Sequence, residues 1–233
     1  MGHQRNRRWR GARGLDRVQR AHARVGGLAV TARRPRAKRG EGERLADEIL
    51  EAASTLLLKT GDEEAVSIRA VADAVGVTPP SIYLHFEDKE ALLLAVCERQ
   101  FQRFDEFVEG LVAEVGAGDP AEQLRVRAHA YVRFGLEHPE HYRIMFMGRG
   151  RLMRMPEGAI SAASGFDHLL ANVERCMAAG TMRADDPLLM ASSLWAVVHG
   201  VTSLAIAVPG FPPMGVDALL DHLTAALDRG LAP

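Results

Sequence analysis

The chain has only two cysteines in 233 residues, Cys97 and Cys176, and they lie far apart in the sequence. No Cys-x-x-Cys pair and no cluster of cysteine and histidine occurs at the spacing of metal ligands. The sequence therefore indicates neither a disulfide framework nor a metal site, and we predict no cofactor. This use of cysteine fits a reducing compartment, and we predict a cytoplasmic protein.

Sequence patterns of known catalytic sites are also absent. The chain has no Gly-x-Ser-x-Gly, no glycine-rich phosphate-binding loop and no paired catalytic constellation. Cys97 or Cys176 could in principle form a nucleophile–base pair with a histidine, but nothing in the sequence marks either one. We therefore predict that the protein is not an enzyme.

Charged residues are missing from one long stretch. The thirty positions between Asp186 and Asp217 contain no Asp, Glu, Lys or Arg, which is long enough to cross a membrane. Ser192, His199 and Ser203 make the stretch more polar than a lone spanning helix, and no Lys or Arg flanks it. A buried helix or a dimer-interface helix has the same composition, so we predict no membrane contact.

The net charge of −1 conceals an uneven distribution. Residues 1–40 carry 13 Arg and Lys against one acid, with almost no apolar periodicity, and we expect this tail to be disordered. It is either a basic arm that strengthens DNA binding or, for residues 1–29, an artefact of a start site that truly lies near Val30. The remaining residues are acidic, with 16 basic and 29 acidic groups. Any DNA contact must therefore come from a local basic face or from the tail.

The most informative stretch is SIRAVADAVGVTPPSIYLHFEDKEAL, residues 67–92. Apolar residues recur at i, i+3, i+4 and i+7 from Ile68, which predicts a helix, and Gly76 can take the left-handed backbone that ends it. Thr78 then caps a second helix of about two turns, which we expect to end near His85. Two short helices joined by a three-residue turn let the second helix lie in a DNA major groove.

These residues resemble the DNA-binding signature of the TetR/AcrR family of transcriptional regulators. The family pattern closes as Ile-Tyr-x-His/Tyr-Phe-x-x-Lys, and here IleTyrLeuHisPhe begins at Ile82. Pro80 is a departure, because many members have glycine there. TrpAlaValValHisGly, from Trp195 to Gly200, resembles the Trp-x-x-x-His-Gly (WHG) element of one C-terminal subfamily. We expect Gly200 to allow close approach of another helix.

The predicted fold is all-α, with about nine helices and a three-helix DNA-binding head on a helical body. Apolar periodicity predicts helices over about 43–60, 89–115, 120–137, 139–147 and 158–179, an apolar helix after Asp186 and a last amphipathic helix from Val216. We expect a tail at 1–40, a DNA-binding domain at 41–90 and an effector-binding and dimerisation domain at 91–233.

The resemblance implies two sets of DNA contacts. Residues that correspond to base-contacting positions are Thr78, Pro79, Pro80, Tyr83 and Leu84. Residues that correspond to phosphate-contacting positions are Ser81, His85 and Lys89, joined by Arg44, Ser67 and Arg69. The second helix has no Arg, Asn or Gln for bidentate base contacts, so we predict modest direct readout supplemented by the basic arm or by DNA shape.

The body is expected to hold a pocket of the family kind. Aromatic and sulfur-containing residues at helical spacing are candidates to line it, and they fit a packed core equally well: Phe104, Tyr131, Phe134, Tyr142, Phe146, Phe166, Cys176, Trp195 and His199. Arg133 either meets an anionic ligand or is exposed.

The resemblance implies a bacterial homodimeric repressor, paired through its last two helices and nucleoid-associated when bound to DNA. A small molecule would release it from a near-palindromic operator on double-stranded DNA. Two alternatives stay open: a repressor or activator without a small-molecule effector, and a small-molecule-binding or enzymatic helical protein with a relic head.

Overall fold

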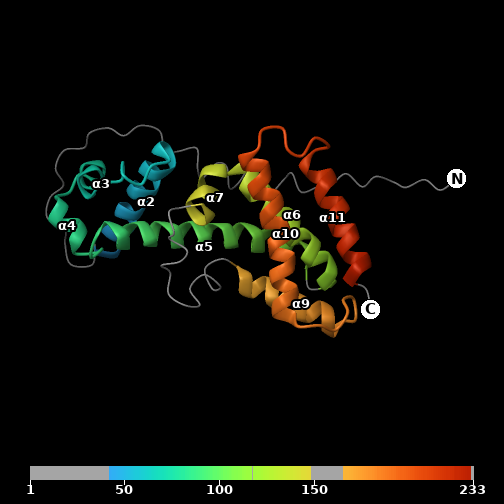
Figure 1. The fold of residues 1–233 in the computed structure, drawn as a ribbon. Helices are drawn as coiled ribbons and strands as arrows, with labels where there is room; N and C mark the ends of the chain where they lie inside the picture. Colours follow the sequence, from blue (N-terminus) through green and yellow to red (C-terminus); the bar gives the residue numbers. More distant parts are fainter. Residues whose placement is uncertain (1–41, 117, 148–164, 232–233) are drawn as a thin grey trace.

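The computed structural model describes residues 42–116, 118–147 and 165–231, which form nine α-helices and no strand (Figure 1). The helices are α2 (Gly42–Thr60), α3 (Ile68–Val75), α4 (Pro79–Tyr83), α5 (Lys89–Val115), α6 (Pro120–Glu137), α7 (Pro139–Phe146), α9 (Phe166–Ala178), α10 (Pro187–Ala207) and α11 (Val216–Leu231). The predicted all-α fold is confirmed. The basic tail lies outside the described residues.

Helices α2, α3 and α4 form the head at one end of the molecule (Figure 1). Its core consists of buried apolar side chains from these helices and from the first turns of α5: Ile49, Ala53, Leu57, Val66, Val71, Ala72, Ile82, Leu92, Leu93 and Val96. Ile144 of α7 joins the same cluster. The head is therefore packed onto the body through shared side chains.

Helix α5 runs from the head into the body (Figure 1). It begins after Asp88, whose carboxylate accepts a hydrogen bond from the Ala91 N–H at 2.7 Å, and it continues for 27 residues. At 1.5 Å per residue it spans about 40 Å. Its buried side chains include Leu92 in the head and Val112 near its other end, so one helix contributes to both cores.

The body is built around α6, which contacts α5, α7, α9 and α10. Helix α10 is apolar over its whole length, and by length and composition alone it could cross a membrane. Here it packs against α6, α9 and α11, with Met190, Ala191, Val201 and Thr202 buried. Most of its other residues are half-buried or exposed within the described part of the chain.

Three local features differ from the sequence-based expectations. Helix α4 ends at Tyr83 rather than near His85, because the backbone N–H groups of His85 and Phe86 both donate to the Ile82 carbonyl and close a turn. Helix α9 begins at Phe166, directly after Gly165 with a φ of +70°, and the expected start near residue 158 lies outside the described residues. A Cβ placed at Gly200 would have no packing neighbour within 4 Å in the described ranges, so the close approach expected there does not occur within them.

Candidate DNA-binding head and ligand cavity

Helices α3 and α4 form the predicted helix-turn-helix. The Ser67 hydroxyl accepts a hydrogen bond from the Ala70 N–H at 3.1 Å and caps α3. Gly76 ends that helix in the left-handed region, at a φ of 76°, and its N–H donates to the Ala72 carbonyl at 2.9 Å. Thr78 occupies the N-cap position of α4, but its hydroxyl bonds the Ser81 hydroxyl at 3.0 Å instead of a backbone N–H.

The predicted DNA-contacting residues lie largely on the surface of the head. The exposed ones are Arg44, Ser67, Arg69, Pro79, Pro80, Tyr83 and Leu84, and the half-buried ones are Thr78, Ser81, His85 and Lys89. Leu84 is 82% exposed and Tyr83 is 53% exposed, whereas the neighbouring Ile82 is fully buried. Two large apolar groups facing solvent at this place suit contact with thymine methyl groups.

Two of the predicted phosphate contacts have ion-pair partners within the head. The Lys89 ammonium lies 3.5 Å from a Glu64 carboxylate oxygen, and the Arg44 Nε donates to Glu48 at 3.2 Å. Both pairs involve exposed groups, and such pairs contribute about 1 kcal/mol or less. Lys89 and Arg44 can therefore exchange these carboxylates for DNA phosphates at little cost.

A buried polar group joins the head to the body, and the sequence analysis did not identify it. Gln100 of α5 is fully buried, its amide nitrogen donates to the Ser54 hydroxyl at 2.8 Å, and its amide oxygen lies 2.6 Å from His141 Nδ1. Helices α2, α5 and α7 thus meet at one side chain. Two ion pairs at 2.6 Å, Arg99–Asp47 and Arg103–Glu51, hold α5 to α2 along its exposed side.

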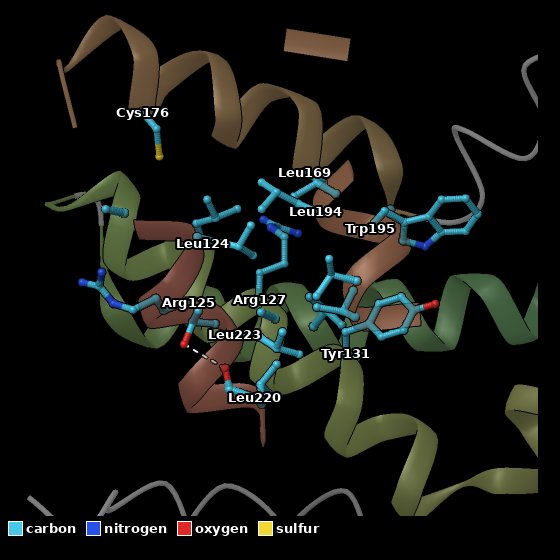
Figure 2. Close-up of a pocket in the computed structure, with 18 of the residues that line it drawn as sticks. Leu124, Arg125, Arg127, Tyr131, Leu169, Cys176, Leu194, Trp195, Leu220 and Leu223 are labelled. Atoms are coloured by element: carbon cyan, nitrogen blue, oxygen red, sulfur yellow. Dashed lines mark hydrogen bonds between the residues drawn. The ribbon is translucent and has the colours of Figure 1, made fainter. Parts of the chain in front are cut away.

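The body contains a cavity of about 190 Å³ between α5, α6, α9, α10 and α11 (Figure 2). Its lining is mainly apolar and includes Val108, Leu124, Leu169, Met182, Leu194, Val198, Leu220, Leu223 and Leu227. Five of the predicted pocket residues also line it: Phe104, Tyr131, Phe166, Cys176 and Trp195. A mostly apolar, partly open cavity with a few polar groups is typical of small-molecule sites.

The other four predicted pocket residues, Phe134, Tyr142, Phe146 and His199, are not part of the cavity lining and pack beside it. They form an aromatic cluster in which Tyr142 and Phe146 ring centroids are 4.8 Å apart and Phe146 and His199 centroids are 4.9 Å apart. Periodicity alone could not separate the two sets, because core aromatic residues and pocket aromatic residues have the same spacing.

His199 is the polar centre of that aromatic cluster. Its Nδ1 lies 2.7 Å from the Tyr142 hydroxyl and 3.0 Å from the Tyr131 hydroxyl, which connects α10 with α7 and α6. Burial lowers the pKa of His199, and burial raises the pKa of both tyrosines. The lowered pKa favours the neutral imidazole, and its tautomer decides whether Nδ1 accepts from a tyrosine hydroxyl or donates to it.

Arg127 is a buried charged residue of the cavity lining that sequence reasoning missed. It is only 7% exposed, and both of its terminal nitrogens bind the two carboxylate oxygens of Glu109. The available signal was its position four residues before Tyr131, which places both on one face of α6. Arg133, the arginine considered instead, is not in the lining and binds Glu137 at 2.9 Å.

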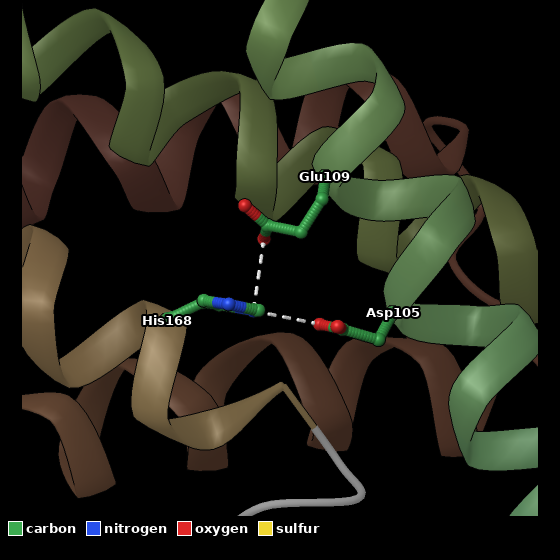
Figure 3. Close-up of side chains that lie close together, drawn as sticks. All are labelled: Asp105, Glu109 and His168. Atoms are coloured by element: carbon green, nitrogen blue, oxygen red, sulfur yellow. Dashed lines mark hydrogen bonds and ion pairs between the residues drawn. The ribbon is translucent and has the colours of Figure 1, made fainter.

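At the rim of the cavity, Glu109 and Asp105 of α5 face His168 of α9 (Figure 3). The His168 Nδ1 lies 2.9 Å from Asp105 and 3.6 Å from Glu109. Within the described ranges these three side chains are close enough to share a cation. Glu109, however, is already bound by Arg127, so an internal ion-pair network accounts for the arrangement.

Two models of known protein families match this chain. Residues 49–96 match the model for bacterial regulatory proteins of the tetR family, and residues 124–227 match the tetracyclin repressor-like C-terminal domain. Among curated proteins no sequence matches the chain.

Solved structures share the whole architecture. A protein with unknown function from Rhodococcus sp. RHA1 is 28% identical, with a TM-score of 0.67, and the match covers 81% of this chain and 96% of that one. A TetR-family transcriptional regulator from Pectobacterium atrosepticum is 24% identical, with a TM-score of 0.64 and coverage of 84% and 98%. RolR, solved in complex with the ligand resorcinol, is 17% identical, with a TM-score of 0.61 and coverage of 82% and 89%.

A helix-turn-helix head on a helical body with a mainly apolar cavity defines a DNA-binding transcriptional regulator of the all-α type. The two family matches cover the head and most of the body, including the Trp195-to-Gly200 element. The chain belongs to the TetR family of transcriptional regulators.

Proposed function

We propose that the protein is a homodimeric repressor that a small molecule releases from a near-palindromic operator. The observation that carries this proposal is the double role of α5. Leu92 and Leu93 at its start belong to the head core, and Phe104 and Val108 further along line the cavity. A ligand that moves the cavity wall therefore moves a helix on which the head is built.

The proposed dimer forms through the exposed face of α10, assisted by α11. Leu189, Ser193, Ala196, Gly200 and Leu204 recur at intervals of three or four residues, which places them on one face of the helix. Leu189 is 62% exposed and Leu204 is 47% exposed in the single chain. The open space beside Gly200 leaves room for a partner helix to approach closely. Binding to two successive half-sites requires a two-fold axis that sets the two α4 helices about 34 Å apart, one turn of DNA.

Release requires that the ligand prefers a dimer shape in which the heads do not fit the operator. A ligand with equal affinity for both shapes would shift nothing. The coupling is reciprocal, so operator DNA must weaken ligand binding by the same factor. RolR, a protein of the same fold, binds resorcinol, which supports a body that takes up small organic molecules. Operator binding would place the protein in the bacterial cytoplasm, on the nucleoid.

The first experiment is footprinting of the full-length protein on the promoter region beside its own gene, at several salt concentrations. We expect protection of a two-fold symmetric site and affinity that falls as salt rises. Salt-sensitive binding without a footprint would show that the basic tail alone holds DNA. No binding by a folded dimer would favour a remote operator or the relic-head alternative.

Tyr83→Ala and Lys89→Ala test the docking of α4 on that operator. Each should weaken operator binding about ten-fold or more, by loss of a base contact or of a phosphate contact, with little change in thermal stability. Lys59→Ala removes a lysine outside the predicted contact set and serves as the matched control. Wild-type affinity in both Tyr83→Ala and Lys89→Ala would show that this docking is wrong.

A further inference from the structure

The cavity has one buried charged side chain whose bonding is incomplete. Arg127 is more than nine-tenths buried, and within the described part of the chain its Nε–H has no hydrogen-bond partner. Figure 2 shows the guanidinium among Leu124, Leu169 and Leu194, all of which line the cavity. A buried donor without a partner is uncommon in folded proteins and costs about 1–3 kcal/mol, so it marks a place where a ligand acceptor gains a hydrogen bond.

Three other polar side chains of the lining have internal partners. The Thr181 hydroxyl donates to the Cys176 carbonyl at 3.1 Å, and the Thr224 hydroxyl donates to the Leu220 carbonyl at 3.0 Å. The Tyr131 hydroxyl is bonded within the tyrosine–histidine cluster. Among the buried side-chain nitrogen and oxygen atoms of the described residues, Arg127 Nε is the one in this lining that lacks a partner.

The positive charge of the Arg127 guanidinium is already compensated by nearby carboxylates. Glu109 binds both terminal nitrogens of its guanidinium, and Asp105, a second carboxylate, lies at the cavity beside Glu109 (Figure 3). A carboxylate ligand would bring a further negative charge next to these two and would find a single N–H instead of the usual pair. A neutral oxygen acceptor satisfies the Nε–H without that repulsion.

The size of the cavity limits the ligand. An apolar cavity of about 150 Å³ holds benzene. A cavity of about 190 Å³ therefore holds a molecule slightly larger than one ring. The apolar lining favours hydrocarbon over most of that molecule's surface.

We propose that this cavity binds a small neutral carbonyl compound, a single ring or a short chain, whose oxygen accepts a hydrogen bond from Arg127 Nε–H. The inference rests on the proposed function in taking this cavity as the effector site. It adds the chemical class of the effector and the residue that selects it.

Three probes of similar shape test the class by calorimetry on the full-length protein without DNA: acetophenone, α-methylstyrene, in which a CH₂ replaces the oxygen, and benzoate, which is an anion. We expect acetophenone to bind about ten-fold or more tightly than α-methylstyrene, because a hydrogen bond to a charged donor contributes at least this factor. Benzoate should bind more weakly than acetophenone.

Arg127→Lys keeps a positive charge for Glu109 and removes the Nε–H. Acetophenone affinity should fall to that of α-methylstyrene, whose own affinity stays unchanged. If this variant unfolds, the double variant Arg127→Met/Glu109→Gln removes the donor together with its counter-charge and should give the same loss of preference. Ala128→Leu, which narrows the cavity, should weaken both neutral probes.

Equal affinity for acetophenone and α-methylstyrene would overturn the inference, as would tighter binding of benzoate or no binding of any probe. A preference for acetophenone that survives in both arginine variants would also overturn it. Operator footprinting distinguishes failure of this inference from failure of the proposed function. An operator-binding protein without the preference refutes the inference alone, and the preference in a protein that never binds an operator refutes the repressor function alone.

Discussion

Gly135 of α6 lies directly against Thr202 of α10. A Cβ at position 135 would meet the Thr202 methyl group and would come within 3.1 Å of the Tyr142 ring. Thr202 is fully buried, and its hydroxyl donates to the Val198 carbonyl at 2.7 Å, which fixes the direction of the methyl group. The two central helices of the body therefore touch where one of them has no side chain.

Gly135→Ala should destabilise the protein by about 1–3 kcal/mol, because an added methyl group in a packed contact forces the helices apart. The measurement is urea denaturation followed by circular dichroism. Gly110→Ala is the matched control, since Gly110 lies within α5 and a Cβ there would meet no described neighbour within 4 Å. That change should be neutral or stabilising by up to about 1 kcal/mol. A Gly135→Ala protein as stable as wild type would contradict the close contact.

Stability should depend on pH through His199. Burial lowers its pKa in the folded protein, so the unfolded chain binds a proton more readily. The stabilising contribution is complete above the unfolded pKa of about 6.5 and is lost as pH falls through the lower folded value. The free energy of unfolding should therefore decrease below about pH 6.5, and less steeply in His199→Gln. Identical slopes in the two proteins would assign the pH dependence to other histidines.

Gln100→Leu should uncouple the head from the body. The change leaves the Ser54 hydroxyl and His141 Nδ1 without their buried partner, and we expect a loss of about 1–3 kcal/mol in stability. Operator affinity should also respond less to an effector in this variant. Gln102→Leu, at an exposed position of the same helix, controls for the loss of a glutamine. Full stability and full effector response in Gln100→Leu would exclude this coupling role.

Leu204→Glu should convert the proposed dimer into monomers, because it places a charge on the exposed face of α10. Sedimentation velocity at micromolar concentration provides the measurement. Leu136→Glu, which changes a leucine of α6 that is 40% exposed, should leave the oligomeric state unchanged. A Leu204→Glu dimer would move the interface away from this face.

The sequence was sufficient to predict the elements whose signals are local. Ser67, Gly76 and Asp88 end or begin helices through bonds to residues at most four positions away, and the structure has each of these caps. The all-α fold and the TetR family follow from such local patterns. The end of α4 was misplaced because Leu84 and His85 continue a helical pattern that the turn at Ile82 interrupts.

Features that depend on contacts between distant residues could not be predicted. Arg127 looks like any helical arginine until Glu109 and the leucines of α9 and α10 surround it. Gly200 was expected to allow close approach of another helix, but within the described chain Gly135 has that role, since only the packing of α6 on α10 decides which glycine lies in their contact. His199 has no partner within four residues in the sequence, and its tyrosines come from two other helices.

Ile144 of α7 is part of the head core together with Leu92 and Leu93, so the boundary at residue 90 that the sequence suggests is not a boundary of the core. A fragment that stops there would expose the apolar face that these side chains cover. Chimeras that exchange DNA specificity between relatives should therefore join the chains within α5, beyond Val96, and adapt position 144 to the new head. In this protein the head core includes a side chain of the body, so the head is not an exchangeable module by itself.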